Sequence, residues 1–249
     1  MNRRPPQRRR IGGLYIDDVG MNDAVGIIES AIRRVEQIRV CTPNAQHVVL
    51  AADDIEFRNV TNSADLCIPD GMGVVYASRW LRSPLRGTVG GRRLLEELCA
   101  RAETTGWRVC LFGSADGVAA RAADVLRKRH PHLNVAAVSP GIVALPNENY
   151  GQGEFPEISC EILFVALGAP KQEKWIASMM PRLDTVVAVG VGSSLDVIGG
   201  RVPFPPRWTT ALGFEWLFRL VNEPGRLWRR YILGIPRFAA IVVHQRLWP

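Results

Sequence analysis

A short segment around Asp70 combines a carboxylate with glycines in a pattern that could do chemistry. Asp70 follows an apolar run and a proline, and it precedes Gly71 and Gly73. A carboxylate in such a place can act as a general base, and the glycines let a ligand approach the backbone closely. An Asp-Gly turn is also common in loops, so these residues alone leave both interpretations open.

Residues 168–175, Gly-Ala-Pro-Lys-Gln-Glu-Lys-Trp, form a second segment of this kind. A glycine after an apolar strand, a proline and then polar residues indicate an anion or sugar site at the N-terminus of a helix. Lys171 could contact phosphate, Gln172 could bond to sugar hydroxyls, and Glu173 completes the polar turn. The alternative is a capped helix with an exposed first turn.

Weaker signals come from the remaining polar and glycine residues. Gly113 opens a turn at 113–117 that looks like a phosphate turn but lacks the full dinucleotide fingerprint, and the chain has no Walker lysine motif. The four histidines have no metal-ligand spacing, and no Asp-x-Asp could hold a divalent ion on a diphosphate. We therefore expect neither a metal nor another cofactor.

These segments follow short β-branched runs that alternate with helical patterns. The alternation predicts an α/β fold with a mostly parallel, Rossmann-like sheet and helices on both faces. In such a sheet, ligands bind beyond the carboxyl ends of the strands, where the polar segments lie. The expected strands are 14–17, 39–42, 65–68, 108–112, 135–138, 161–167 and 185–189, and the expected helices are 23–35, 45–53, 73–80, 92–104, 117–129 and 171–179.

Composition and charge narrow the classes of protein. With 249 residues, 47% of them hydrophobic, the chain can form one or two domains with a substantial core, which argues against a chain that is disordered throughout. Five scattered cysteines without a C-x-x-C pair favour a reduced, cytosolic compartment. The net charge of +7 is segregated, because the first ten residues carry five Arg and residues 201–249 carry eight Arg against two Glu. Basic ends indicate nucleic acid or an anionic membrane surface as a partner.

The same segregation predicts three parts: a disordered Arg-rich leader at 1–11, an α/β domain at 12–200 and a basic amphipathic helical appendage at 201–249. No stretch reaches 18 consecutive apolar residues, and the N-terminus lacks the apolar core of a secretory signal. The appendage holds four of the seven Trp and a helical pattern at 208–222, which Pro224 should end. Arg and Trp on such helices are typical of an interfacial membrane anchor, and an ordinary packed C-terminal helix is the equal alternative.

Four motifs in a fixed order resemble the WecG/TagA/CpsF glycosyltransferases from about residue 12 to about residue 230. They are Thr-Pro-Asn-Ala at 42–45, Pro-Asp-Gly-Met-Gly at 69–73, the segment 168–175, and Gly-Phe-Glu-Trp-Leu-Phe-Arg-Leu at 213–220 with Glu223, Pro224 and Arg226. The resemblance implies an inverting, metal-independent hexosyl transfer from a UDP-sugar to a polyprenyl-diphosphate-linked sugar at the cytoplasmic face of the plasma membrane. The sugar would be N-acetylmannosamine, its uronic acid or glucose, and the product a teichoic acid, exopolysaccharide or other cell-envelope polymer.

The resemblance also assigns roles to matching residues. It implies that Asp70 is the catalytic base, that Thr42 and Asn44 form the strand-end pocket, and that Gln172 faces the sugar. Arginines of the appendage would close over the site and neutralise the leaving diphosphate in place of a metal. We thus predict Asp70, Thr42 and Gln172 as catalytic, and Asn44, Gly71, Gly73, Arg93, Gly113, Lys171, Glu173, Asp196, Arg219, Arg226 and Arg229 as substrate-binding.

Three segments depart from the family pattern. Arg93 stands where the family has the acid of R-V-T-G-S-D, and we hypothesise that it reads an anionic group on the sugar or diphosphate. Asp196 of the G-x-F-D motif is kept, whereas Phe204-Pro205-Pro206 lacks the arginine of R-A-P. Residues 147–159 contain Gly, Glu and Pro in place of a helix, which predicts a shortened element. These changes indicate a divergent branch with a changed sugar.

Two other classes of function compete with the enzyme. A catalytically silent scaffold at the membrane would bind a nucleotide sugar or a lipid diphosphate and form no product. A nucleic-acid binder is suggested by the pI of 9.6. Residues 11–200 carry 18 basic against 22 acidic residues, and this acidic body and the lack of a recognisable binding module argue against it. The expected partners are therefore a UDP-sugar, a polyprenyl-diphosphate-linked acceptor and an anionic membrane surface, and the sequence leaves open a homo-oligomer.

Overall fold

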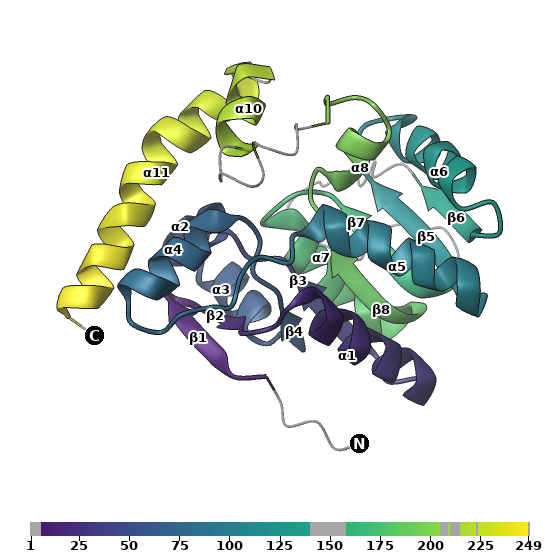
Figure 1. Cartoon of the computed structure of the whole chain (residues 1–249), viewed down its shortest axis with the longest axis horizontal. Coiled ribbons are helices and arrows are strands. Elements are labelled where there is room, and N and C mark those ends of the chain that lie inside the picture. The colour runs from purple at the N-terminus through teal and green to yellow at the C-terminus, as the bar shows by residue number, and fades with distance from the viewer. Residues whose placement is uncertain (1–5, 140–157, 205–208, 210–214, 223, 249) are drawn as a thin grey trace.

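A parallel sheet forms the centre of the molecule (Figure 1). The computed structural model describes residues 6–139, 158–204, 209, 215–222 and 224–248. Within them six parallel strands are ordered β4-β3-β8-β7-β5-β6, which confirms the predicted sheet. Their bounds are β3 (Ile38–Cys41), β4 (Leu66–Cys67), β5 (Arg108–Gly113), β6 (Asn134–Ser139), β7 (Ser159–Ala166) and β8 (Asp184–Gly190).

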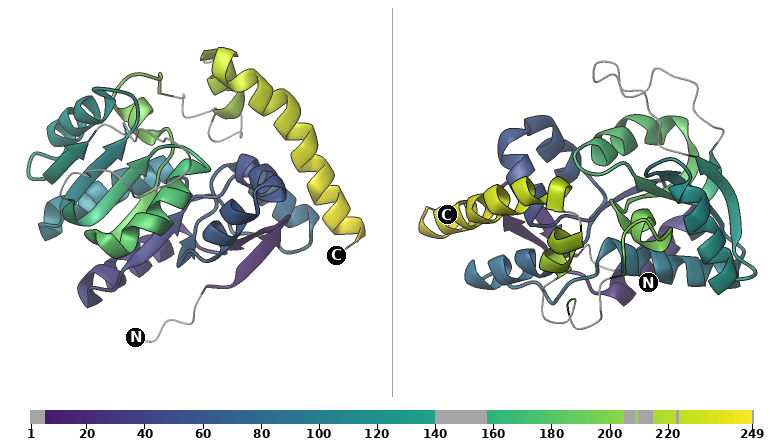
Figure 2. Two further views of the ribbon diagram at one scale, coloured as in Figure 1. Left: turned by 180° about the vertical axis from the view of Figure 1, so that it is seen from behind. Right: turned by 90° about the horizontal axis from the view of Figure 1, so that it is seen from above.

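Helices cover both faces of this sheet (Figure 2). One face carries α1 (Met21–Arg34), α5 (Gly91–Thr105), α6 (Val118–Arg129) and α8 (Ser194–Ile198), and the other carries α7 (Lys171–Met179) followed by the 3₁₀ turn η1 (Met180–Arg182). Helix α3 (Ile55–Asn62) contacts α7 and α2 (Ala45–Asp53), and α4 (Met72–Trp80) contacts β1 (Arg8–Ile11).

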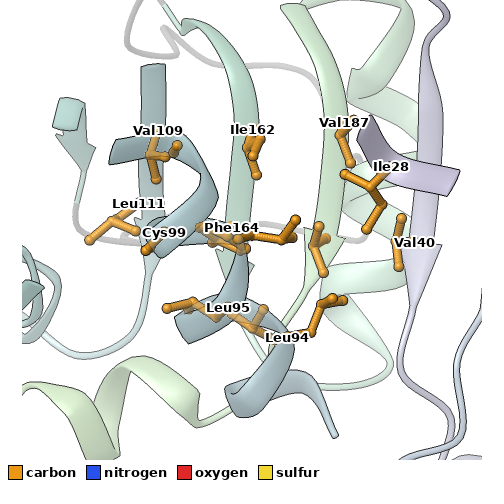
Figure 3. Close-up of a cluster of buried hydrophobic side chains, with 14 of the residues drawn as sticks. Ile28, Val40, Leu94, Leu95, Cys99, Val109, Leu111, Ile162, Phe164 and Val187 are labelled. Atoms are coloured by element: carbon orange, nitrogen blue, oxygen red, sulfur yellow. The ribbon is translucent and has the colours of Figure 1, made fainter. Parts of the chain in front are cut away.

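Alternate residues of β7 serve the two faces. Ile162 and Phe164 pack into the core beneath α1 and α5 (Figure 3), whereas Leu163 and Val165 pack with Trp175 of α7. Side chains of a strand alternate between faces, and here both sets are apolar because both faces are covered. The sequence of β7 is therefore a continuous apolar run from Ile162 to Ala166.

Most of the predicted elements are confirmed to within two residues at each end. Helices α3 and α8 are short and were not predicted. Asp54 ends α2 and also begins α3, where its carboxylate accepts a hydrogen bond from Phe57 N at 2.8 Å, so the sequence runs from one helix into the next without a glycine or proline. The shortened element predicted at 147–159 lies outside the described residues, apart from the start of β7.

The predicted disordered leader at 1–11 is wrong for its last four residues. Arg8–Ile11 form β1, which pairs antiparallel with β2 (Leu14–Asp17). The Arg8 guanidinium donates to Asp17 Oδ1 at 3.1 Å and to the Ala64 carbonyl at 2.7 Å, and the Ile11 side chain is fully buried. Charge that would be solvated in a leader instead pairs with a buried carboxylate.

Two helices confirm the predicted helical appendage. They are α10 (Glu215–Asn222) and α11 (Pro224–Leu247), and Pro224, which we expected to end a helix, is the first residue of the second one. Proline is tolerated there because the first helical N–H has no partner within the helix. The second half of α11 packs on α2 through buried Val242, and Gln245 Nε2 donates to the Arg10 carbonyl at 3.0 Å. The first half extends past α2 toward α10 (Figure 1).

Candidate active site

A cavity of about 570 Å³ opens at the carboxyl ends of the strands. The loops after β3, β4, β5, β7 and β8 all line it, through Thr42, Asp70, Ser114, Gly168 and Gly192 respectively. Strand β5 leads to α6 on one face of the sheet, whereas its neighbour β7 leads to α7 on the other. Loops that diverge in this way leave a crevice, which is where open parallel sheets bind their ligands.

Thr42 ties two strands together at the floor of the cavity. Its hydroxyl donates to the Gly190 carbonyl at 2.9 Å, and the side chain is buried. A side chain at Gly91 would begin 3.4 Å from Thr42 Cγ2, so the first turn of α5 lies close to Thr42. The Thr42 proton is thus engaged, and its oxygen is the atom left to accept a hydrogen bond from a ligand.

The loop that carries Asp70 is held by backbone hydrogen bonds. Asp70 N donates to the Pro43 carbonyl at 3.0 Å, and Val89 N donates to the Pro69 carbonyl at 2.9 Å. Gly71 directly precedes α4 and has a φ of +79°, a conformation that a side chain would strain. The backbone of Asp70 is therefore fixed, and Asp70 lines the cavity, where a carboxylate can serve as a general base.

Gln172 is buried and braces two loops. Its Oε1 accepts hydrogen bonds from Gly168 N at 3.2 Å and from Gly192 N at 3.0 Å, and its Nε2 donates to Glu173 Oε1 at 2.7 Å. A side chain at Gly190 would begin 2.8 Å from that Nε2, so glycine is needed to make room. A contact with a sugar, as predicted, has to come from the remaining Nε2 hydrogen.

We expect Gln172→Met to lower the free energy of unfolding by about 1–3 kcal/mol, because it leaves the amides of Gly168 and Gly192 without their acceptor. Loosened loops should also lower kcat/KM. Denaturant unfolding and initial transfer rates measure the two effects. Gln46→Met, the same change at another lining residue, is the control, and equal losses in both variants would contradict the bracing role.

His47 also lines the cavity and was not singled out from the sequence. Asn44 caps α2 through Oδ1, which accepts from Gln46 N and His47 N and lies 3.0 Å from His47 Nδ1. The other ring nitrogen, Nε2, lies 3.3 Å from Glu173 Oε1. Both ring nitrogens thus face oxygen atoms, and His47 links the cap of α2 to the first turn of α7. Glu173, predicted to bind substrate, is buried and is not among the lining residues, and it contacts His47 and Gln172, which are.

A second polar cluster lies where β5 ends. Asp196 Oδ1 accepts from Ser114 Oγ at 2.8 Å and from Arg201 Nη1 at 3.0 Å, and all three residues line the cavity. Gly113 is not among the lining residues. It has a φ of +106°, and a side chain there would begin 2.7 Å from the Ala166 backbone, so its function is to let β5 end against β7.

Comparison with known proteins agrees with this geometry. Residues 9–249 match the model of the Glycosyl transferase WecG/TagA/CpsF family. The chain belongs to this family. It is 30% identical over 206 residues to N-acetylglucosaminyldiphosphoundecaprenol N-acetyl-beta-D-mannosaminyltransferase of Bacillus subtilis (strain 168), covering 83% of this chain and 79% of the relative.

Two further relatives carry the same name. The protein of Bacillus spizizenii is 32% identical over 208 residues, covering 83% of this chain and 79% of the relative. The protein of Staphylococcus aureus (strain MW2) is 28% identical over 228 residues, covering 91% of this chain and 88% of the relative. This chain is thus a glycosyltransferase, and its family membership extends from β1 to the end of α11.

Arg92, and not Arg93, reaches the cavity of this glycosyltransferase. Arg93 is exposed on α5 and is not among the lining residues, whereas Arg92 lines the cavity and lies 3.3 Å from Glu96 and 5.1 Å from the centre of the Phe204 ring. Neighbouring residues of a helix point about 100° apart, so a family pattern alone does not show which one faces the site.

The other predicted binding residues lie nearby. Lys171 is exposed at the start of α7 and does not line the cavity. Gly73 does not line it either, and a side chain at Gly73 would begin 3.3 Å from Ala45 Cβ. Gly71 and Gly73 therefore shape the backbone beside Asp70. Among the described residues, no three His, Cys, Asp or Glu side chains come together as metal ligands, and metal independence stays a prediction.

The appendage approaches the rim of the cavity. A side chain at Gly234 of α11 would begin 3.2 Å from Oε1 of Gln46, which lines the cavity. Arg226 and Arg229 precede Gly234 by about 12 and 7.5 Å along the helix at 1.5 Å per residue. Their side chains, and that of Arg219 on α10, lie outside the described part of the chain, so their contacts stay a prediction.

Proposed function

We propose that this glycosyltransferase moves N-acetylmannosamine, its uronic acid or glucose from a UDP-sugar to a polyprenyl-diphosphate-linked sugar, with inversion and without a metal. The observation that carries the proposal is that Asp70, Thr42 and Gln172 line one cavity at the strand ends. The volume of about 570 Å³ lies in the range of small-molecule sites. Relatives named for transfer to N-acetylglucosaminyldiphosphoundecaprenol support this acceptor class.

Asp70 supplies the base in this reaction. Its carboxylate takes the proton of the acceptor hydroxyl while that oxygen attacks the anomeric carbon of the donor. The bond from the anomeric carbon to the diphosphate breaks, and UDP leaves with the electron pair. Attack from the opposite side inverts the configuration at that carbon.

The leaving diphosphate needs cations, and the arginines among the described lining residues are already paired with acids. Arg92 and Arg201 line the cavity, but Arg92 pairs with Glu96 and Arg201 pairs with Asp196. Additional guanidinium groups can grip a diphosphate through two parallel hydrogen bonds and always stay charged. Because α11 approaches the rim of the cavity, the arginines of α10 and α11 can supply these groups.

The outer face of α11 supports a membrane location. Five apolar side chains of α11 recur at helical spacing and are 43–61% exposed: Trp228, Ile232, Ile235, Val243 and Leu247. Val221 of α10 is 71% exposed. An apolar stripe with arginines beside it is typical of a helix that lies in the headgroup region of a bilayer. No helix in the described residues combines the length and the hydropathy of a membrane span. We propose a peripheral position on the inner face of the plasma membrane.

A donor and acceptor screen tests this function. UDP-N-acetylmannosamine, its uronic acid and UDP-glucose are each mixed with short-chain diphosphate-linked N-acetylglucosamine or glucose, and UDP release and product mass are measured. We expect one pair to turn over. Binding of UDP without product from any pair would instead favour the silent scaffold.

A further inference from the structure

A second cavity lies at the far end of α11 and shares no lining residue with the candidate active site. Its volume is about 320 Å³. Three segments line it: β1 through Arg10, the end of α4 through Leu81 and Ser83, and α11 through Gln245 and Arg246. Hydrogen bonds hold two of these segments together, because Gln245 Oε1 accepts from Gly12 N and Gln245 Nε2 donates to the Arg10 carbonyl.

Two arginines in this cavity have no acidic partner in the part of the chain that the structure describes. Within the described residues, the guanidinium groups of Arg10 and Arg246 form no ion pair, and no acid is among the lining residues. Arg8 and Arg9 of the same strand do pair, with Asp17 and Asp18. The helices α4 and α11 both end here, and their carboxyl ends carry about half a negative charge each. Together this is less than the positive charge of the two arginines. The cavity is thus suited to an anion.

Three exposed aromatic residues are neighbours of the lining residues, either across the β1–β2 ladder or along the chain. Tyr15 is the partner of Arg10 across the β1–β2 ladder and is 44% exposed. Trp80, beside Leu81, is 60% exposed, and Trp248, close to Arg246, is 64% exposed. Trp and Tyr combine an apolar ring with a polar edge, and they are enriched at the level of lipid headgroups.

Helix α11 connects the second cavity with the rim of the active site. From Gly234, which lies against the active-site rim, to Arg246 the helix rises by about 18 Å. The exposed apolar stripe of α11 runs between the two points. A bilayer that accepts this stripe would therefore meet both the active-site rim and the second cavity.

The geometry points to a binding site for the phosphate of an anionic lipid headgroup, held by Arg10 and Arg246 with Ser83 as a further hydrogen-bonding group. Guanidinium groups bind phosphate through paired hydrogen bonds, and the aromatic rim enters the headgroup layer. Two attachments about 18 Å apart fix the direction of α11 on the surface and hold the active site toward a lipid-linked acceptor. This site rests on the proposed membrane location of the enzyme.

The double variant R10Q/R246Q tests the site in the full-length protein. Vesicles of phosphatidylcholine with phosphatidylglycerol are titrated, and we expect the affinity to fall about 30-fold, which is the about 2 kcal/mol of two arginines near an anionic surface. The matched control is R33Q/R34Q, which removes the same charge from α1, where both arginines have acidic partners. The control should bind vesicles like the wild type.

Further arms separate the alternatives. Inorganic phosphate at the concentration of the lipid phosphate should not displace the protein from vesicles, and displacement would overturn the lipid assignment. Unchanged vesicle affinity of R10Q/R246Q with a lowered Tm would mean that the arginines only stabilise the helix ends, and this too would overturn it. R10Q/R246Q should keep the wild-type rate on a short-chain acceptor free in solution and lose rate on an acceptor embedded in vesicles. If no donor turns over on any acceptor, the proposed function fails while the vesicle result still stands.

Discussion

Asp70→Asn should lower kcat by about 10²–10⁴-fold, the contribution of a positioned general base. Asparagine keeps the size of the side chain, and the backbone bond from residue 70 to the Pro43 carbonyl is not altered. The amide cannot take the proton of the acceptor hydroxyl, so the attack on the anomeric carbon loses its base. Initial rates at saturating donor measure the loss, and calorimetric titration with UDP should show unchanged donor affinity.

The matched control is Asp116→Asn. Asp116 is exposed in the turn after β5 and does not line the cavity, so the same change of charge should leave the rate unaltered. If Asp70→Asn kept wild-type turnover, Asp70 would not be the base. An equal loss in both variants would point to the overall charge of the protein as the cause.

Arg226→Ala is expected to have the second largest effect. By analogy with the loss of one oxyanion donor, kcat should fall about 10²–10³-fold, because the charge that develops on the leaving diphosphate loses a cation. Arg226→Lys should recover part of this loss, since lysine keeps the charge without the two-pronged hydrogen bonds. Rates with the short-chain acceptor separate this effect from membrane attachment.

Arg237→Ala removes the same charge from the same helix and serves as the control. Arg237 pairs with Asp53 of α2 and therefore has another task. A wild-type rate in Arg226→Ala, or an equal loss in Arg237→Ala, would show that Arg226 does not meet the diphosphate. Deletion of the whole appendage is a poorer test, because Val242 and Phe238 of α11 pack into the core.

The fold could be predicted because the sequence patterns are local. Strands such as β7 contain continuous apolar runs, and helices such as α2 begin after a capping residue, Asn44. The parallel sheet then brings the strand ends together, so Thr42 and Asp70 could be placed at one site from their positions alone. Gln172 was placed there by its motif, and the structure adds that its amide braces the loops after β7 and β8.

What could not be predicted depends on contacts between distant residues. The strand β1 exists because Arg8 finds Asp17 and Ala64, which no local pattern reveals. His47 becomes part of the site through Glu173, 126 positions away in the sequence. Arg92 lines the cavity in place of the predicted Arg93 because packing on the sheet fixes which face of α5 points to the cavity. The family motif does not show this orientation.

The configuration of the product tests the central claim most directly. The enzyme is incubated with the UDP-sugar that turns over and a short-chain diphosphate-linked acceptor in the presence of a chelator, and the one-bond carbon–proton coupling at the new anomeric centre is measured by NMR. The account predicts a product of inverted, β configuration formed at the same rate as without the chelator. A product of retained, α configuration, or loss of turnover in the chelator that added divalent ions restore, would contradict it.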